Sequence, residues 1–281
     1  MSKKVIFKKF NGTGELSRHL ATAILQRPFE NEAVRHGSYT KDSEDYTKWA
    51  KTNTYAEADE LLLYGCKELQ KRIENAGVAK LRLQLNSYTN RRRIVSSIVG
   101  FAANVPAYLA GTPNSMINVK QRKEKQRVLS FMYNTSVSCG VSAERIIKAA
   151  AKVVSAIMII EAGGVRVNVW AGEAFKQSNQ PDCLWLCKIK EAGQRMDTLK
   201  MSYPIAHPSM LRRQWFRLLE TTEGVPSEYV WGYGSVIDNE RRCMETLKNA
   251  GVNNIQRALC FDEVEYKTPE EIAKMLVEGV K

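Results

Sequence analysis

The chain of 281 residues lacks the short motifs that mark the common hydrolases, metalloproteases and nucleotide-binding enzymes. It contains no Gly-x-Ser-x-Gly, no Walker loop and no His-Glu-x-x-His. The Gly-x-Gly at 232–234 is not set in the strand-to-helix spacing of a phosphate-binding loop, so it favours a tight turn. These absences argue against an enzyme, and we expect a protein without catalytic activity.

Metal-ligating side chains are also few and dispersed. The three histidines stand alone, and Cys183 and Cys187 have no second Cys/His pair to complete a zinc site. The six cysteines are scattered through apolar segments, which favours reduced, buried thiols and excludes a disulfide scaffold. We therefore expect no tightly held cofactor.

Long hydrophobic runs are missing as well. The longest candidate, at 149–160, is interrupted by Lys152 and Ser155 and falls short of the ~18 residues that a membrane span needs. Residues 1–7 lack the apolar core and cleavage site of a signal peptide. We expect a soluble, intracellular protein that does not enter a membrane.

What the chain does contain is a single segment with most of its excess positive charge. Residues 80–127 hold ten Lys or Arg residues and one acid, Glu124, a net charge of +9 against +12 for the whole chain. Charge at this density repels itself, which predicts an anionic partner. The same window holds Tyr88, Phe101 and Tyr108, and cations interleaved with aromatic rings suit single-stranded nucleic acid.

We expect the nucleic-acid contacts to come from the cations and tyrosines of this basic window. The candidates are Arg82, Tyr88, Arg91, Arg92, Arg93, Tyr108, Lys120, Arg122, Lys123, Lys125 and Arg127. The alternative interpretation is a solvated turn at the triple arginine and a solvated charge run at 120–127. A membrane surface is a third anionic partner, ranked lower because no strongly amphipathic basic helix is evident.

The second half of the chain predicts a regular α/β fold. A compact apolar strand at 128–133 precedes Ser142, a natural helix N-cap, and the following helix carries one apolar stripe until Gly163. An alternating strand at 165–171 completes a βαβ unit with two parallel strands. Further strands and helices alternate to the end, where Thr268 opens a capping box. They include a strand over 257–262 and a helix over 209–221, in which we expect Arg212 and Arg213 to point to water rather than to contact phosphate. In the first half, the pattern predicts one helix over 55–75 and a strand over 80–86.

The predicted fold class is therefore α/β. We expect a Rossmann-like three-layer sandwich with a mostly parallel sheet, preceded by a helical, basic N-terminal region. The strand, loop, helix and strand from 128 to 171, with Asn134, Ser136 and Ser138 in the loop, resemble a von Willebrand A domain. The predicted division is a mixed α/β basic region at 1–127, packed on the core, and an α/β core at 128–281. One continuous domain is the alternative.

The loop at 134–138 lies between the predicted strand and helix. In von Willebrand A domains an Asp-x-Ser-x-Ser loop at this position holds a divalent cation, and this loop resembles it through Asn134, Ser136 and Ser138. The first ligand is an amide rather than a carboxylate, which weakens binding of a hard cation such as Mg²⁺. We favour the interpretation that the loop caps the helix and shapes the turn.

Three stretches together resemble a known family. They are 99–116 (VGFAANVPAYLAGTPNSM), the loop at 134–138 with its helix, and 203–213 (YPIAHPSMLRR). The resemblance as a whole spans roughly residues 55–220. The family consists of phage-encoded single-stranded-DNA-binding proteins whose fold is not the usual OB barrel. They serve as cofactors of the phage RNA polymerase that transcribes middle genes, in podoviruses with a giant virion RNA polymerase.

The resemblance implies a nonenzymatic transcription cofactor in the host cytoplasm, with single-stranded DNA and a phage RNA polymerase as partners. It transfers no binding residues, so the candidates above rest on charge and aromatic rings alone. Two alternatives belong to other classes. One is a von Willebrand A-like protein-interaction module, and the other is a phage structural or host-takeover protein with a basic face. The oligomeric state does not follow from the sequence.

Overall fold

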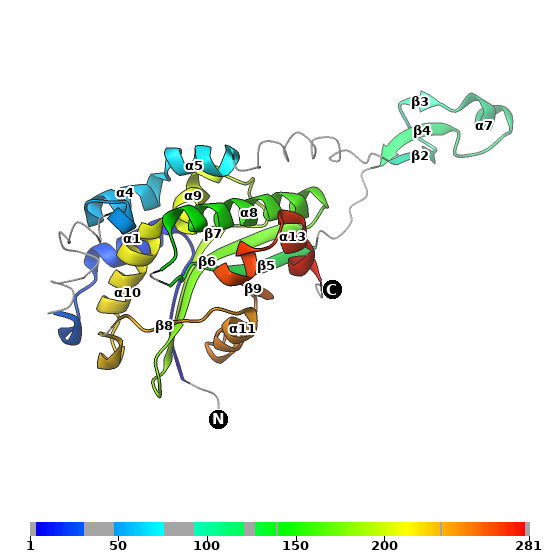
Figure 1. Cartoon of the computed structure of the whole chain (residues 1–281). Coiled ribbons are helices and arrows are strands. Elements are labelled where there is room, and N and C mark those ends of the chain that lie inside the picture. The colour runs from blue at the N-terminus through cyan, green and yellow to red at the C-terminus, as the bar shows by residue number, and fades with distance from the viewer. Residues whose placement is uncertain are drawn as a thin grey trace.

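The computed structural model describes residues 4–30, 48–75, 93–120, 127–138, 140–230 and 232–278. Its centre is a six-stranded sheet in the order β1-β7-β6-β5-β9, with β8 paired to β6 (Figure 1). The strands are β1 (Val5–Phe10), β5 (Val128–Asn134), β6 (Arg166–Lys176), β7 (Asp182–Lys190), β8 (Ser235–Val236) and β9 (Arg257–Leu259).

Strand direction within this sheet is mostly parallel. The pairs β1/β7, β5/β6 and β5/β9 are parallel, whereas β6 pairs antiparallel with β7 and β8. The predicted Rossmann-like α/β sandwich with a largely parallel sheet is therefore confirmed.

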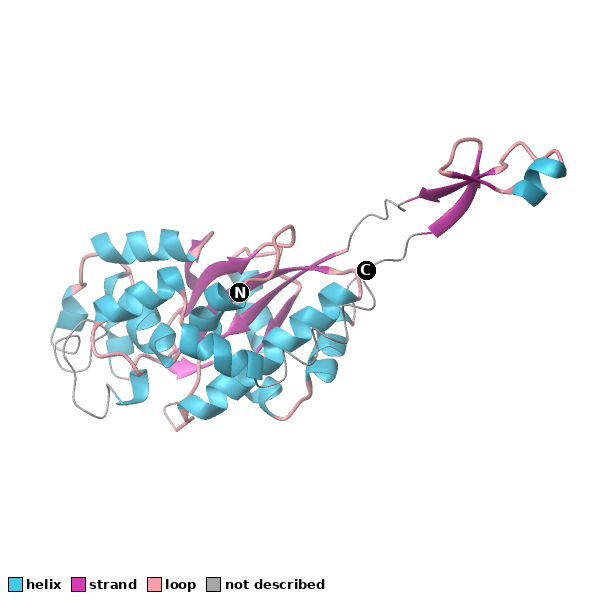
Figure 2. Ribbon diagram, turned by 90° about the horizontal axis from the view of Figure 1, so that it is seen from above, coloured by secondary structure: helices cyan, strands magenta, loops and turns pink. Residues whose placement is uncertain are grey.

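Alternation along the strands builds two apolar layers, because successive side chains of a strand point to opposite faces. On β7, Trp185 and Cys187 belong to the larger buried cluster, while Leu184 and Leu186 belong to the smaller one. The helix α11 (Glu240–Asn249) covers the smaller cluster through Cys243 and Leu247, on the face of the sheet opposite α8 (Ala143–Ala162) (Figures 1 and 2).

The remaining helices lie mainly on the α8 side. They are α1 (Thr13–Thr22), α4 (Tyr55–Tyr64), α5 (Lys67–Ile73), α9 (Thr198–Ala206), α10 (Phe216–Thr221), α12 (Phe261–Glu265) and α13 (Pro269–Val277), with short helical turns η1 (Arg27–Phe29), η3 (Met210–Trp215) and η4 (Ser227–Val230). As the sequence predicts, Ser142 caps α8 and Thr268 caps α13 with a complete capping box.

The N-terminal residues are part of this core. Strand β1 extends the central sheet beside β7, and Leu16, Leu62 and Ile73 are buried in the same apolar cluster as β5 and α8. The described residues of the N-terminal part thus share the larger apolar cluster with β5 and α8.

Some predicted boundaries differ from the structure. The single helix expected over 55–75 breaks at Gly65, whose φ of +81° ends α4. A Cβ at this position would lie 2.3 Å from the Leu199 carbonyl oxygen, so the break allows α9 to approach closely. The strand expected over 257–262 ends at Leu259, since Cys260 already caps α12. The strand expected at 80–86 lies outside the described residues.

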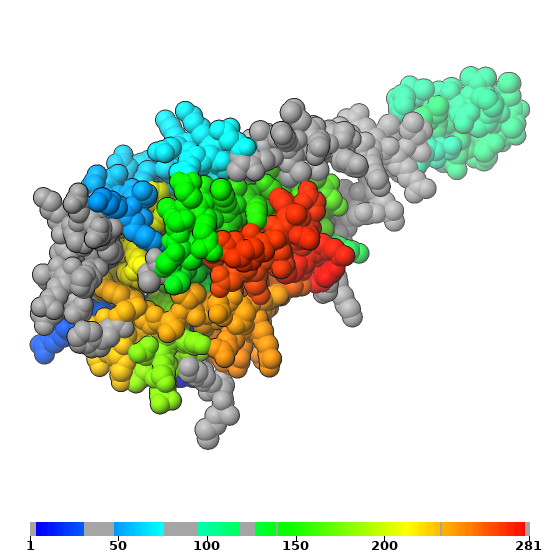
Figure 3. Space-filling model, in the orientation of Figure 1, coloured from blue at the N-terminus to red at the C-terminus, as the bar shows by residue number. Residues whose placement is uncertain are grey.

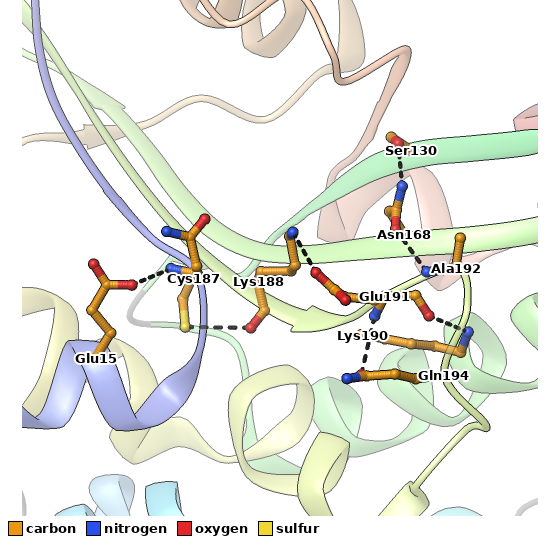
Figure 4. A network of polar contacts seen from close by, with 10 residues as sticks. Glu15, Ser130, Asn168, Cys187, Lys188, Lys190, Glu191, Ala192 and Gln194 are labelled. Carbon is orange, nitrogen blue, oxygen red and sulfur yellow. Dashed lines mark hydrogen bonds and ion pairs between the residues drawn. The ribbon is translucent and has the colours of Figure 1, made fainter.

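An ion pair between Lys190 and Glu161 links the end of β7 to α8. Lys190 is 3% exposed, and its ammonium donates to Glu161 Oε1 at 2.6 Å and to the carbonyls of Val167 and Glu191 at 3.2 Å each. Close by, Asn168 donates to Ser130 and accepts from the Ala192 amide, which ties β5, β6 and the chain after β7 together (Figure 4).

The described cysteines are free thiols, and four of them, Cys183, Cys187, Cys243 and Cys260, are buried. Burial raises the pKa of Cys183 to about 12, which makes it unreactive. Among the helices of the described ranges, none has both the length and the apolar character needed to cross a bilayer.

Candidate nucleic-acid interface and the loop at the sheet edge

The middle of the basic window forms a small sheet of its own, which we call the arm (residues 93–120). It contains β2 (Arg93–Ser97), β3 (Ala102–Ala103), the short helix α7 (Val105–Leu109) and β4 (Met116–Lys120), with the strands in the order β2-β4-β3. Figures 1 and 3 show the arm standing apart from the body that carries the central sheet.

Antiparallel pairing brings the two ends of the arm together. Arg93 is the register partner of Lys120, and the ladder continues to Ser97 opposite Met116. The basic run that ends at Arg93 and the one that begins at Lys120 therefore meet at one end of the ladder. Residues 94–119, between them, contain no Lys, Arg, Asp or Glu.

Residues 95–118 of the arm form no buried core. From 95 to 118, where side-chain exposure is described, no residue is buried. Six large apolar side chains are strongly exposed, by 59–79%: Ile98, Val99, Phe101, Val105, Tyr108 and Leu109. Exposed apolar groups gathered in this way mark an interaction surface, because water contact at so many of them is unfavourable.

Local hydrogen bonds hold this surface in shape. The Phe101 amide donates to the Ile117 carbonyl at 2.9 Å, and the Asn118 side chain donates to the Val99 carbonyl at 2.8 Å. Asn104 caps α7 by accepting from the Ala107 amide, and Pro106 occupies the first turn, where a missing amide costs nothing.

Four of the predicted contact residues lie in the described ranges. Arg93 and Lys120 are paired as above, and Tyr108 on α7 is 71% exposed. Arg127 is exposed at the start of β5, where its carbonyl accepts from the Arg166 amide. The other seven, Arg82, Tyr88, Arg91, Arg92, Arg122, Lys123 and Lys125, lie outside the described residues.

The candidate list omits the exposed apolar residues around Tyr108, including Phe101 and Leu109. Their signal in the sequence is the uncharged stretch between two basic runs. Nothing in the sequence distinguishes such a stretch from a buried segment, because apolar residues are usually inside.

The second candidate, the loop after β5, lies at the carboxyl edge of the parallel strands. Asn134 is fully buried, and its amide nitrogen donates to the Ile237 carbonyl at 2.7 Å. Its oxygen accepts from the amides of Ser136 and Ala174 at 3.3 and 3.2 Å. The side chain thus joins β5, β6 and the segment after β8, and its one oxygen is already occupied.

Of the other two candidate ligands, Ser136 is buried and Ser138 is exposed. In the described part of the chain no three His, Cys, Asp or Glu side chains come together as a metal ion would require. The geometry therefore favours the structural interpretation of Asn134 over a metal ligand.

The arginines at 212 and 213 were expected to point to water. Arg213 is instead fully buried and donates to the Thr52 carbonyl at 3.2 Å. The Arg212 guanidinium lies 4.6 Å from the Trp49 ring and 5.0 Å from the Phe216 ring. The expectation is therefore wrong for Arg213, while Arg212 is half-buried against two aromatic rings.

Comparison with known proteins gives one match. Residues 2–280 match a family described as "Domain of unknown function (DUF7192)". No curated protein and no solved structure matches the chain.

Proposed function

We propose that this chain, which belongs to the DUF7192 family, is a sequence-tolerant single-stranded DNA-binding protein that uses its arm as the DNA-contacting element. The observation that carries the proposal is the pairing of Arg93 with Lys120, which joins two basic runs at the base of an uncharged, exposed tip.

The charge distribution supports an anionic polymer as the ligand. Nine of the twelve net positive charges fall in residues 80–127. Neutralising phosphates with Lys and Arg releases condensed counterions, which is a favourable term that does not depend on sequence. The remaining net charge of the body is small, so attraction is directed to the arm and its flanks.

The exposed tip of the arm favours recognition of single-stranded DNA over duplex DNA, because its aromatic rings are free to contact unpaired bases. Phe101 and Tyr108 are 70% and 71% exposed, and aromatic faces stack on any base. Since residues 94–119 hold no charged side chain, the tip carries none of the Arg, Lys or Glu side chains that most often read base edges. Binding through stacking and phosphate contacts would therefore tolerate most sequences.

The transcription role rests on the family resemblance of residues 55–220. A protein that holds single strands open assists a polymerase that does not melt promoters by itself. We place the protein in this role in the host cytoplasm, without catalytic activity and with a phage RNA polymerase as its second partner.

The test of the proposal is fluorescence anisotropy with labelled single-stranded DNA, single-stranded RNA and duplex DNA over a salt series. If five phosphates are engaged, log K against log salt falls with a slope of about −3 to −4 for single strands. Binding that prefers single-stranded DNA and weakens steeply with salt supports the proposal. Equal affinity for the duplex, or no binding at low salt, contradicts it.

A further inference from the structure

A separate cavity lies in the body, at the carboxyl edge of the central sheet. It has a volume of about 360 Å³ and is bounded by the loop 136–138, by Glu173 and Phe175 of β6, and by the turn at 232–236. A smaller cavity of about 140 Å³ shares Ser136, Val137, Ser138 and Val236 with it and reaches Asp238 and Asp262. We call the two together the sheet-edge pocket.

The position of the pocket is where α/β sheets place their ligands. Strand β5 lies between β6 and β9 in the sheet. The chain passes from β5 to β6 on one side of β5, and only later forms β9 on the other side. The crevice outside the carboxyl ends of strands at such a reversal is the usual binding position in open parallel sheets.

The floor of the pocket contains two buried polar groups without hydrogen bonds. Glu173 is 4% exposed, and its Oε2 forms no hydrogen bond to any described residue. The Ser136 hydroxyl, in a residue 3% exposed, has no partner among the described residues at ordinary hydrogen-bond distance, although it lies close enough to Glu173 to lower the pKa of that carboxyl. Buried polar atoms are nearly always paired because desolvation without a partner is costly, so a polar group bound in the pocket would supply the partner that these two atoms lack.

The rest of the pocket is apolar inside and acidic at its rim. Phe175, Leu211 and Phe216 line the interior. Asp238 and Asp262 are exposed at the rim of the smaller cavity. The pocket is thus lined by three carboxylates, those of Glu173, Asp238 and Asp262, and by one guanidinium, that of Arg212.

Arg212 is held in a stack on one wall. Its guanidinium lies 4.6 Å from the Trp49 ring and 5.0 Å from the Phe216 ring, and the Phe216 ring stacks on Tyr233 with centroids 4.1 Å apart and planes 2° apart. Cation–π contact with these two rings holds the guanidinium at the wall. Its charge acts on Glu173 from there but does not give Oε2 a hydrogen bond.

The turn beside this stack has a strained backbone. Gly232, Tyr233 and Gly234 have φ angles of +77°, +59° and +85° in succession. Positive φ at a tyrosine is unfavourable, and such strain persists mostly where a binding site requires a particular loop shape.

We propose that the sheet-edge pocket binds an aliphatic chain ending in a guanidinium or ammonium group, which passes the acidic rim and pairs with Glu173 on the pocket floor. The cation supplies the donors that Glu173 Oε2 and Ser136 lack, and the apolar walls cover its methylene stem. A divalent metal fits less well, since the oxygen of Asn134 is occupied and no three metal-binding side chains converge among the described residues.

This ligand chemistry has two sources, a basic side chain of a partner protein and a free polyamine. The probes are therefore N-acetylarginine amide for the side chain and spermidine for the polyamine, with agmatine as the simplest case. N-butylurea is the uncharged control, and ionic strength is matched with NaCl. Binding to the full-length protein is measured by isothermal titration calorimetry and by the shift in Tm.

Agmatine is expected to bind and raise Tm, whereas N-butylurea is not. Glu173→Gln keeps the size of the side chain and should lower agmatine affinity about tenfold or more. The paired change Asp238→Asn with Asp262→Asn, at two exposed positions, should weaken binding less and reduce its salt dependence. If Glu173→Gln does not fold, this paired variant of Asp238 and Asp262 provides the test.

If N-acetylarginine amide binds, the site is assigned to a basic side chain of a partner protein. If spermidine binds and N-acetylarginine amide does not, the site is assigned to polyamines. Equal agmatine affinity in the Glu173→Gln variant overturns the proposal, as does equal binding of N-butylurea. A Tm rise with Mg²⁺ but not with agmatine also overturns it. These outcomes are independent of DNA binding by the arm, because the probes are cations.

Discussion

Arg93 and Lys120 are register partners at one end of the antiparallel β2/β4 ladder, although 26 residues separate them in the sequence. Two basic runs that are distant along the chain thereby adjoin one another at the base of the arm. The uncharged residues between them form a tip without a buried core. An element of this composition is stabilised when an anion meets its base and apolar or aromatic groups meet its tip.

The exposed aromatic rings of the tip are predicted to contribute to DNA affinity and not to stability. Phe101→Ala and Tyr108→Ala should each weaken single-stranded DNA binding by about 1–3 kcal/mol, because each removes a stacking face. Tyr64→Ala is the matched control, since Tyr64 on α4 is also 71% exposed but lies in the body. Anisotropy titrations that show equal losses for Tyr64 and Tyr108 would remove the tip from the interface.

The buried pair of Lys190 and Glu161 is predicted to be sensitive to loss of either partner. Lys190→Met leaves a poorly solvated carboxylate and should lower the free energy of unfolding by about 3–5 kcal/mol. The double change with Glu161→Gln should recover part of this loss, because no unpaired charge remains. Urea denaturation checks both, and Lys188→Met, at a more exposed pair with Glu191, should change stability by less than about 1 kcal/mol.

Asn134 is predicted to be structural, so an aspartate there should harm the fold whether or not metal is present. Asn134→Asp removes the donor to the Ile237 carbonyl and places a negative charge beside that oxygen, at a cost of about 1–3 kcal/mol or more. Thermal unfolding with Mg²⁺, Mn²⁺ or EDTA should give the same Tm for the wild type. Stabilisation of the wild type by Mg²⁺ would restore the metal interpretation of this loop.

The free energy of unfolding is predicted to fall with rising pH because of Glu173. Burial raises the pKa of Glu173 to about 8, and the nearby Ser136 hydroxyl and Arg212 charge lower it only in part. Without a bound cation, the folded protein keeps a proton that the unfolded chain releases above its ordinary pKa of 4.5. A cation that binds at Glu173 displaces this proton. This contribution is therefore fully present below pH 4.5 and is lost as pH rises through 8, by about 1.4 kcal/mol per pH unit at most.

Glu173→Gln should remove that pH dependence. The free energy of unfolding of the variant should therefore rise relative to that of the wild type between pH 5 and 9. Glu245→Gln, at an exposed position of α11, is the control and should follow the wild type. Urea denaturation at several pH values measures the difference. An unchanged slope in Glu173→Gln would mean that the carboxylate is not held in a desolvated site.

The regular parts of the body followed from local signals. Ser142, the apolar stripe of α8 and the alternating strand after it lie close together in the sequence, so capping and periodicity suffice to predict that βαβ unit. The break at Gly65 and the early end of β9 did not follow, because they depend on Leu199 and on the Cys260 cap of α12. Such tertiary contacts override helix and strand preferences.

The candidate sites show the same limit. Composition identifies the basic window, but the pairing of Arg93 with Lys120 is a long-range contact that charge counting does not contain. Glu173 was not a candidate at all, since an acid in a strand usually faces water. Its function in the sheet-edge pocket follows only from the burial that β5, β6 and the turn at 232–236 impose on it.

The most direct test of the central claim is charge reversal of the basic run that ends at Arg93, where the arm begins. Arg91, Arg92 and Arg93 are changed together to Glu, and single-stranded DNA affinity is measured by anisotropy over a salt series. The matched control reverses Lys200, Arg241 and Lys248, three exposed cations of the body, and so changes the net charge equally. We predict a large loss of affinity only in the arm variant, with a salt slope flatter by about 0.7 for each phosphate that is no longer neutralised. Equal affinity in the two variants would contradict the assignment of DNA binding to the arm.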